Sequence, residues 1–272
     1  YISSSNVHLY GNTSNRSEVG VTSNGHPEVV LIAGVSNRVI QFSAVMAYPA
    51  SNVLSGLTIT GGSSEWGAVY AGTAAGYLPG HHTVSRCHVV SNTATGLYRV
   101  SVENSTIESC SRSGDGGGAY LVNMTNCVVK NCYASGYGGG VYLNSDTRID
   151  NSLIASNSCT KRGGGVRYGA VYNSVVVSNN AGDRGGGVYS IVGVSNYVAF
   201  NTSRMGAAAY YGSYTNCIFD RNVSGTIGSP TFYGGYRNCL FTSNSTTYAN
   251  GGGAGARGSY YGCVFVGNGA PN

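Results

Sequence analysis

The sequence predicts an all-β fold, a right-handed parallel β-helix of about ten coils with roughly 21–25 residues each. Three observations lead to this fold class. Short runs rich in Val, Ile, Tyr and Phe alternate with Gly, Asn and Ser along most of the chain. Asparagines recur at similar offsets around those runs. Glycine clusters recur with nearly the same period at Gly116, Gly138, Gly163, Gly185 and Gly206, and again at Gly251 after an intermediate coil that starts at Pro230 without a triplet.

The composition argues against the other common solenoids. The 272 residues include 43 glycines, and only 9% of the residues are charged. Leucine-rich repeats need regularly spaced leucines, and helical repeats need an amphipathic helix in every unit, but the sequence has neither. The 42% hydrophobic share argues against disorder. A coil of about 22 residues instead suits short strands on three sides, with neighbouring coils about 4.8 Å apart.

The glycines and asparagines are expected to form the corners of the coils. Glycine adopts positive φ at low cost and lets the backbone of the next coil approach closely. Asparagine tolerates the left-handed conformation and can hydrogen-bond to the equivalent asparagine one coil away. We therefore expect an internal asparagine ladder, and its candidates are Asn131, Asn157, Asn179, Asn222, Asn244 and Asn268.

The chain divides into two parts by its periodicity. Residues 1–60 are less regular and are expected to form the opening coils or a cap over the open end of the solenoid. Residues 61–272 are expected to form the regular coils of one continuous domain. The last strand has no polar cap after it, so we expect this end to stack on another subunit or to continue in a longer chain.

The repeats resemble those of a known group of surface proteins. The segment "GGGVY" at residues 138–142 and the segment "NCIF" at residues 216–219 resemble the GGA-I/V and FxxN repeats of bacterial polymorphic outer-membrane proteins and related autotransporter passengers. The resemblance covers residues 95–272, with Val129 and Val176 in place of the phenylalanine. It implies an extracellular or cell-surface location and a secreted, β-helical chain, without implying a defined activity.

A row of tyrosines is the first candidate ligand site. If strand alternation points Val141 inward, it points Tyr142 outward. An outward aromatic row with a step close to that of a sugar residue suits a polysaccharide; alternatively, the rings only stabilise neighbouring coils by stacking. The expected row is Tyr70, Tyr98, Tyr120, Tyr142, Tyr168, Tyr189, Tyr210 and Tyr233, with the five from Tyr120 to Tyr210 as candidate ligand residues.

Arginines beside the glycine corners form the second candidate site. Arg162, Arg184 and Arg204 precede glycine clusters, so they are expected at one edge of the rod next to the tyrosines. Guanidinium groups bind carboxylates and sulfates bidentately, which favours an acidic glycan as the partner; the alternative is a set of solvated turn residues. The net charge of +5 is not gathered in a long basic run, which argues against nucleic acid as a partner.

Consecutive apolar residues in one strand of each coil predict a covered outer surface. Val128 precedes Val129 and Ile218 precedes Phe219, so one residue of each pair faces outward. A strand that is apolar on both faces is normally covered on both, here either by another subunit or by an intrachain cover such as the N-terminal segment. The candidate self-association residues are Val128, Leu153, Val175, Ile218, Leu240 and Val264.

The cysteines are expected to be mostly buried thiols. A stacked interior position suits a small buried hydrophobe, and Cys87, Cys127, Cys217, Cys239 and Cys263 share such a position. Cys110 and Cys132 share the next corner. Because neighbouring coils bring equivalent Cα atoms to about 4.8 Å, a disulfide between these two is predicted. No cysteine or histidine spacing indicates a metal site, and no cofactor is expected.

Catalysis is not expected, and no catalytic residue is assigned. Lyases and glycosidases with this fold need gathered carboxylates, but the ten acidic residues do not share offsets on neighbouring coils. No segment reaches the roughly 18 apolar residues of a membrane span. The sequence therefore predicts a non-catalytic extracellular rod with a structural or adhesive function. The alternatives are a carbohydrate-active enzyme using Asp146, Asp150 and Asp183, and a self-assembling filament subunit.

Overall fold

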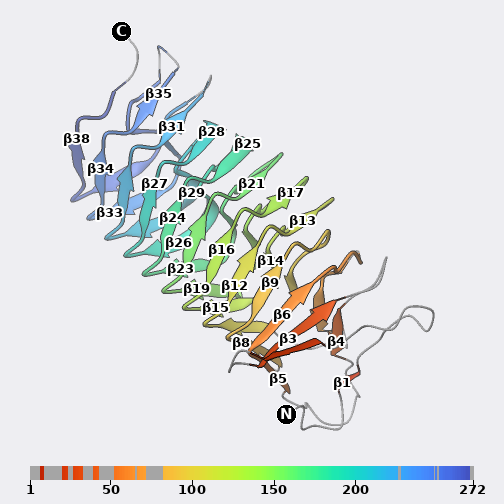
Figure 1. Cartoon of the computed structure of the whole chain (residues 1–272). Helices are drawn as coiled ribbons and strands as arrows, with labels where there is room; N and C mark the ends of the chain where they lie inside the picture. Colours follow the sequence, from red (N-terminus) through yellow and green to blue (C-terminus); the bar gives the residue numbers. More distant parts are fainter. Residues whose placement is uncertain are drawn as a thin grey trace.

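The protein is a rod of stacked coils. The computed structural model describes residues 7–8, 20–23, 27–32, 39–42, 52–64, 66–71, 82–225, 228–247, 249 and 251–269, and these ranges contain strands and no helix. Figure 1 shows the coils following one another along the rod, with the first strands at one end and β38 at the other. The strands form three sheets of 19, 12 and 7 strands.

The strands are short and almost all parallel. The 19-stranded sheet contains β1 (Val7–His8), β4 (Ile40–Phe42), β5 (Asn52–Ser55), β7 (Val69–Ala71), β8 (His82–Ser85), β10 (Leu97–Tyr98), β11 (Ser101–Glu103), β14 (Ala119–Tyr120), β15 (Asn123–Thr125), β18 (Val141–Tyr142), β19 (Arg148–Asp150), β22 (Val166–Arg167), β23 (Ala170–Tyr172), β26 (Val188–Val194), β29 (Ala209–Thr215), β32 (Thr231–Phe232), β33 (Gly235–Arg237), β36 (Gly255–Ala256) and β37 (Ser259–Tyr261). The 12-stranded sheet contains β2 (Gly20–Ser23), β3 (Pro27–Ile32), β6 (Leu57–Thr60), β9 (His88–Val90), β12 (Thr106–Glu108), β16 (Val128–Lys130), β20 (Leu153–Ala155), β24 (Val175–Val177), β27 (Tyr197–Ala199), β30 (Ile218–Asp220), β34 (Leu240–Thr242) and β38 (Val264–Val266). The 7-stranded sheet contains β13 (Ser111–Arg112), β17 (Tyr133–Ala134), β21 (Ser158–Cys159), β25 (Asn180–Arg184), β28 (Thr202–Met205), β31 (Val223–Ser224) and β35 (Ser245–Thr246).

About eight regular coils follow Leu97, and each crosses all or most of the three sheets. Strands β4 to β9 form the same pattern in the preceding part of the chain. The parallel pairing of successive coils confirms the predicted parallel β-helix. At the N-terminal edge the pairing changes, because β2 pairs antiparallel with β3 and β1 pairs antiparallel with β4.

The core runs along the inside of the coils as rows of equivalent residues. Val129, Ile154 and Val176 are fully buried and pair in register on the 12-stranded sheet. Further along the same row, Phe219 and Phe241 stack with ring centroids 5.0 Å apart. The valines that replace phenylalanine in the repeat therefore occupy the same inward position as the phenylalanines. Because the row is buried from Ile59 to Phe241, its apolar character holds the sheets together.

The glycine triplets allow two close approaches at one corner. Gly138 adopts φ +65°, which is the left-handed region, and it is the first glycine of its triplet. At Gly139, a Cβ would collide with the carbonyl groups of Ser158 and Gly164 on the next coil. The backbone N–H of Gly139 instead donates to the carbonyl of Gly163 at 3.0 Å. The triplet is thus required for both the turn and the stacking of coils.

The asparagines form two rows rather than one. The first row, which includes Asn126 at φ +53° and Asn151 at φ +48°, takes the left-handed conformation at an exposed corner. The second row is the buried ladder, and its members are Asn157, Asn179, Asn201, Asn222, Asn244 and Asn268. The expectation for Asn131 was wrong, because Asn131 is an exposed corner residue with positive φ and Cys132 takes the ladder position below Asn157.

Candidate functional site: an arginine corner beside a tyrosine row

The predicted tyrosine row is present, with two changes of register. Tyr120 pairs with Tyr142, but Tyr142 then pairs with Arg167, and Arg167 pairs with Tyr189. The placement of Tyr168 in the row was therefore wrong by one residue. The placement of Tyr233 was also wrong by one residue, because Phe232 pairs with Tyr210 in the row. Between Tyr70 and Phe232 the row consists of Tyr70, Tyr98, Tyr120, Tyr142, Arg167, Tyr189, Tyr210 and Phe232.

A difference in spacing from the glycine corner displaces Tyr168. Arg167 follows Gly163 at the offset at which Tyr142 follows Gly138, and Tyr168 comes one residue later. Tyr168 takes φ +62° at the turn and meets Tyr142 edge-on, with ring centroids 5.9 Å apart. The strand that follows each of these triplets is only two residues long, so the outward position is always its second residue. Counting residues from the triplet would therefore have identified Arg167 in place of Tyr168.

The row faces away from the core, but its rings are largely covered. Val188 is fully buried inside, whereas its neighbour Tyr189 belongs to a separate hydrophobic cluster with Tyr210 and Phe232. Tyr189 and Tyr210 are stacked, with centroids 5.5 Å apart and ring planes 3° apart, and only 6% and 4% of them are exposed. The faces of these rings therefore contact other rings, and mainly their edges reach the surface.

Three arginines from successive coils gather around one carboxylate. The Nε atoms of Arg162 and Arg184 lie 3.4 Å and 3.5 Å from Oδ2 of Asp183, and Nη2 of Arg204 lies 2.9 Å from Oδ1. Their positions at one edge agree with the prediction. We call Arg162, Arg167, Asp183, Arg184 and Arg204 the arginine corner. One carboxylate faces three guanidinium groups, so the corner carries excess positive charge.

Arg167 joins this corner as a buried charge that the sequence did not reveal. It is 9% exposed, and its guanidinium lies 3.8 Å from the ring centroid of Tyr137 and 4.3 Å from that of Tyr168. Its Nη2 donates to the Tyr168 hydroxyl at 2.9 Å. Among the described residues its Nε has no hydrogen-bond partner, and no carboxylate forms an ion pair with it. Cation–π contacts therefore hold Arg167 in place.

Arginines also rest on the tyrosine row. The guanidinium of Arg162 lies 5.5 Å from the ring centroid of Tyr189, and that of Arg184 lies 5.1 Å from that of Tyr210. Burial raises the pKa of Tyr210, although Arg184 acts in the opposite direction. Burial alone would lower the pKa of Arg162, but Tyr189 and Asp183 outweigh it and raise the pKa. At neutral pH the Tyr210 phenol is thus uncharged and the Arg162 guanidinium charged.

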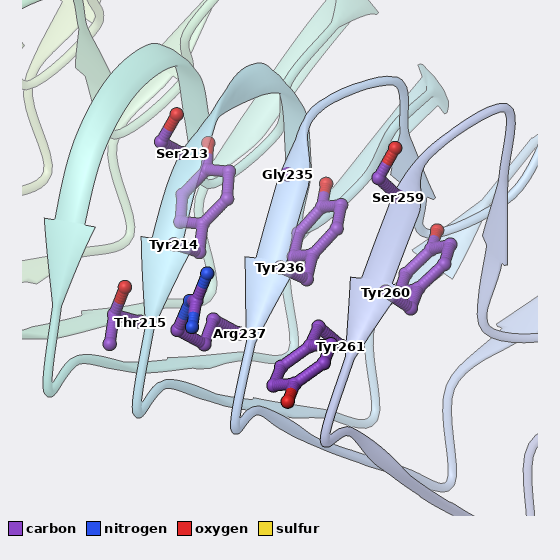
Figure 2. A pocket seen from close by; sticks show the side chains of 9 residues that line it. All are labelled: Ser213, Tyr214, Thr215, Gly235, Tyr236, Arg237, Ser259, Tyr260 and Tyr261. Atoms are coloured by element: carbon purple, nitrogen blue, oxygen red, sulfur yellow. The ribbon is translucent and has the colours of Figure 1, made fainter.

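Two hollows lie along the 19-stranded sheet. The larger, of 700 Å³, adjoins the row and is lined by residues that include Tyr142, Tyr168 and Tyr172. The smaller, of 480 Å³, crosses β29, β33 and β37 near the C-terminal end (Figure 2). No atom lies within 4 Å of the position that a Cβ on Gly235 would take, so there is free space at this residue. The guanidinium of Arg237 lies 5.0 Å from the ring centroid of Tyr261. The larger hollow shares Tyr142 and Tyr168 with the surroundings of Arg167.

The acids named for the enzymatic alternative lie on different elements. Asp150 is on β19 and pairs with Arg148 at 2.9 Å, whereas Asp183 is on β25 within the arginine corner. Asp146 accepts a hydrogen bond from the Ser145 hydroxyl at 3.3 Å. Over the described ranges, no three His, Cys, Asp or Glu residues are grouped so that they could hold a metal ion.

The predicted apolar residues do form one outward row on the 12-stranded sheet. Val128, Leu153, Val175, Ile218, Leu240 and Val264 are connected through successive parallel pairings. Tyr197 completes the row between Val175 and Ile218, and the sequence interpretation did not include it. Val175 and Ile218 are 38% and 39% exposed, so this face is open along the middle of the rod.

The cysteines are free thiols in the structure. Seven are buried, and Cys263 is partly exposed. A hydrogen bond with the Cys132 thiol lowers the pKa of Cys110, so the two side chains are neighbours as predicted. Both are free, and the predicted disulfide is not formed in this structure.

Comparison with known proteins agrees with the fold. The model of the family described as "Right handed beta helix region" matches residues 21–203. Because this match covers most of the chain, the protein belongs to that family of right-handed β-helices. No curated protein and no solved structure matches the chain. Among the residues with described positions, no helix is long and apolar enough to cross a membrane.

Proposed function

We propose that this protein is a non-catalytic, extracellular β-helical rod that contacts an acidic glycan through the arginine corner. The observation that supports the proposal most directly is the charge balance around Asp183. Three guanidinium groups share its carboxylate, and Arg167 adds a fourth positive charge without an acid partner in the described part of the chain. Carboxylate or sulfate groups on a glycan would balance this excess.

The exposed fractions indicate how the corner would act. The side chains of Arg162, Arg184 and Arg204 are 32%, 29% and 48% exposed, so all three reach the surface. The tyrosine row beneath them supplies a rigid surface on which the guanidinium groups rest. In this arrangement the tyrosines position the arginines, while Tyr168 and Tyr172 in the larger hollow are available to the sugar rings.

A retention experiment tests the proposal. The protein is applied to immobilised acidic and neutral polysaccharides and eluted with a salt gradient, while the eluate is assayed for short sugar products. We expect retention on the acidic polymer only. The double variant Arg162→Gln with Arg204→Gln should elute at clearly lower salt, because it loses two of the four cationic groups of the corner.

A matched variant separates a local site from net charge. Arg148→Gln with Arg237→Gln removes the same charge from other strands, where Arg148 pairs with Asp150 and Arg237 lies against Tyr261. We expect this control to elute close to the wild type. Equal losses in the two double variants would contradict a defined site, and release of short sugars would contradict the non-catalytic part of the proposal.

A further inference from the structure

Three cysteines occupy consecutive positions of one row that precedes the strands of the 12-stranded sheet. The backbone N–H of Leu240 donates to the carbonyl of Cys217 at 3.0 Å, and that of Val264 donates to the carbonyl of Cys239 at 2.9 Å. Cys217, Cys239 and Cys263 therefore lie in register on three successive coils, and we call them the thiol row. The whole row from β9 onward reads Cys87, Ser105, Cys127, Ser152, Ser174, Asn196, Cys217, Cys239 and Cys263.

The side chains of the thiol row repeat one geometry from coil to coil. The Cys239 sulfur lies 3.7 Å from the carbonyl oxygen of Tyr214, three residues before Cys217. The Cys263 sulfur lies 3.5 Å from the carbonyl oxygen of Tyr236, three residues before Cys239. Equivalent Cα atoms of neighbouring coils are about 4.8 Å apart, which is within the range that a disulfide bridges. Each neighbouring pair of the row is thus placed for a bond between its sulfurs.

The three thiols differ in access and in acidity. Cys217 and Cys239 are 1% and 2% exposed, whereas Cys263 is partly exposed. A hydrogen bond with the Cys239 thiol lowers the pKa of Cys217, which favours the thiolate at this position. Because the thiolate is the nucleophile in disulfide exchange, Cys217 is suited to accept a bond from Cys239. A dissolved oxidant reaches the row most easily at Cys263.

We propose that Cys263 is the entry thiol through which a small disulfide, such as oxidised glutathione, converts the buried Cys217–Cys239 pair into a disulfide. The Cys263 thiolate attacks the sulfur–sulfur bond of the oxidant, and one small thiolate leaves. Cys239 then attacks the Cys263 sulfur, and the second small thiolate leaves. Finally Cys217 attacks the Cys239 sulfur, and Cys263 leaves as a free thiol.

This sequence balances without a further reactant. Two protein thiols, those of Cys217 and Cys239, are oxidised, and one small disulfide is reduced to two thiols that take up the two protons. The last transfer is favoured by position, because the three sulfurs follow one another along the row and the attacking sulfur approaches opposite to the leaving one. The product fastens the coil of β30 to that of β34. The row lies inside the coils, so this proposal does not depend on glycan binding.

A second thiol pair supplies a comparison within the same molecule. Cys110 and Cys132 are also in register, since the backbone N–H of Tyr133 donates to the carbonyl of Cys110 at 2.9 Å. Their thiols are also hydrogen-bonded to each other, and both are buried. The neighbours of this pair in its own row are Asn92 and Asn157. The pair therefore has the geometry of Cys217 and Cys239 but no entry thiol beside it.

Peptide mapping after timed oxidation tests the proposal. The reduced full chain is incubated with oxidised glutathione at about pH 8, quenched with acid, alkylated in denaturant and digested. Trypsin places each cysteine of the thiol row on its own peptide, because it cleaves after Arg221, Arg237 and Arg257. Mass spectrometry should find Cys217 linked to Cys239 and Cys263 alkylated. The Cys110–Cys132 pair should stay alkylated over the same time.

Two serine variants identify the entry point. Cys263→Ser should slow formation of the linked peptide at least about tenfold, because a buried thiol then reacts only when its coil opens. Serine suits this row, since Ser105 and Ser152 occupy equivalent positions in it. Cys127→Ser is the matched control. It removes another cysteine of the same row whose neighbours are these two serines, so oxidation should proceed at the wild-type rate.

Several outcomes would overturn the proposal. A Cys263→Ser protein that forms the Cys217–Cys239 bond at the wild-type rate would show that Cys263 is not the entry point. A bond found only between Cys239 and Cys263 would show that no transfer to Cys217 occurs. Equally fast oxidation of the Cys110–Cys132 pair would show that buried thiols react without an entry thiol. A wild-type chain that forms no disulfide would contradict the reaction itself.

Discussion

Replacing Asn179 in the buried ladder tests how the coils are held together. Its side chain donates to the carbonyl of Ile154 at 2.9 Å and to Oδ1 of Asn201 at 3.1 Å. Its Oδ1 accepts from the backbone N–H of Asn157 at 2.9 Å and from the amide of that side chain at 3.0 Å. Asn179 is fully buried, so Asn179→Ala would leave these groups without a replacement from solvent.

The expected loss follows from the groups left unpaired. A buried polar group without a partner costs about 1–3 kcal/mol, and Asn179→Ala removes the acceptor of the Asn157 backbone N–H and the side-chain donor to the carbonyl of Ile154. Partial relaxation of the neighbouring coils reduces the sum, so we expect a loss of about 2–4 kcal/mol in the free energy of unfolding. The loss should be largest in the coils next to Asn179, because each coil contacts only its neighbours.

The next residue supplies a matched control. Asn180 is exposed and donates to the hydroxyl of Thr202 at 2.7 Å, so Asn180→Ala should cost less than about 0.5 kcal/mol. Urea unfolding followed by far-UV circular dichroism measures both variants. If Asn179→Ala and Asn180→Ala lowered the free energy of unfolding equally, the ladder would not have the role described here.

Two further predictions concern the corners and the thiols. Gly139→Ala should lower the free energy of unfolding by about 3 kcal/mol or more, seen as a fall in Tm of at least about 6 °C, whereas Gly235→Ala should be nearly neutral because open space surrounds that position. A similar Tm for the two variants would contradict the close stacking of the triplets. Burial raises the pKa of Cys159 to about 12 and that of Cys127 to about 11, and only the thiolate reacts, so iodoacetamide at pH 8 should label Cys263 first by mass spectrometry. Fast labelling of Cys159 in the folded protein would show that the interior rows open readily.

The repeat predicted the fold because every coil must satisfy the same local requirements. Glycine is needed where a Cβ would meet the next coil, and Gly139 shows that this requirement is steric. Alternation within short strands predicted which apolar residues face outward, and the row through Val128 and Val175 confirmed it. These features depend on residue type and on nearest neighbours, so they can be read along one chain.

Register at the corners was predicted less well, because adjacent residues of the right type compete for one position. Tyr168 follows Gly163 one residue later than Tyr142 follows Gly138, so Arg167 takes the position expected of Tyr168. Asn131 was misplaced because a corner residue with positive φ directly precedes the buried ladder position, and in this coil the asparagine takes the corner while Cys132 takes the ladder position. Choosing between adjacent residues requires knowing which of them the next coil contacts.

By itself, then, the sequence determined the solenoid, its all-β character and the outward apolar row, because stacking equivalent coils places like residues on like. Only the tertiary structure decided the composition of the arginine corner. Arg162, Asp183 and Arg204 are on different coils, and their side chains meet because backbone pairing sets the register of β25 against its neighbours. The tertiary structure also decided that the faces of the tyrosine rings are covered. Stacking depends on the distance between rings on neighbouring coils, which the sequence of one repeat does not specify.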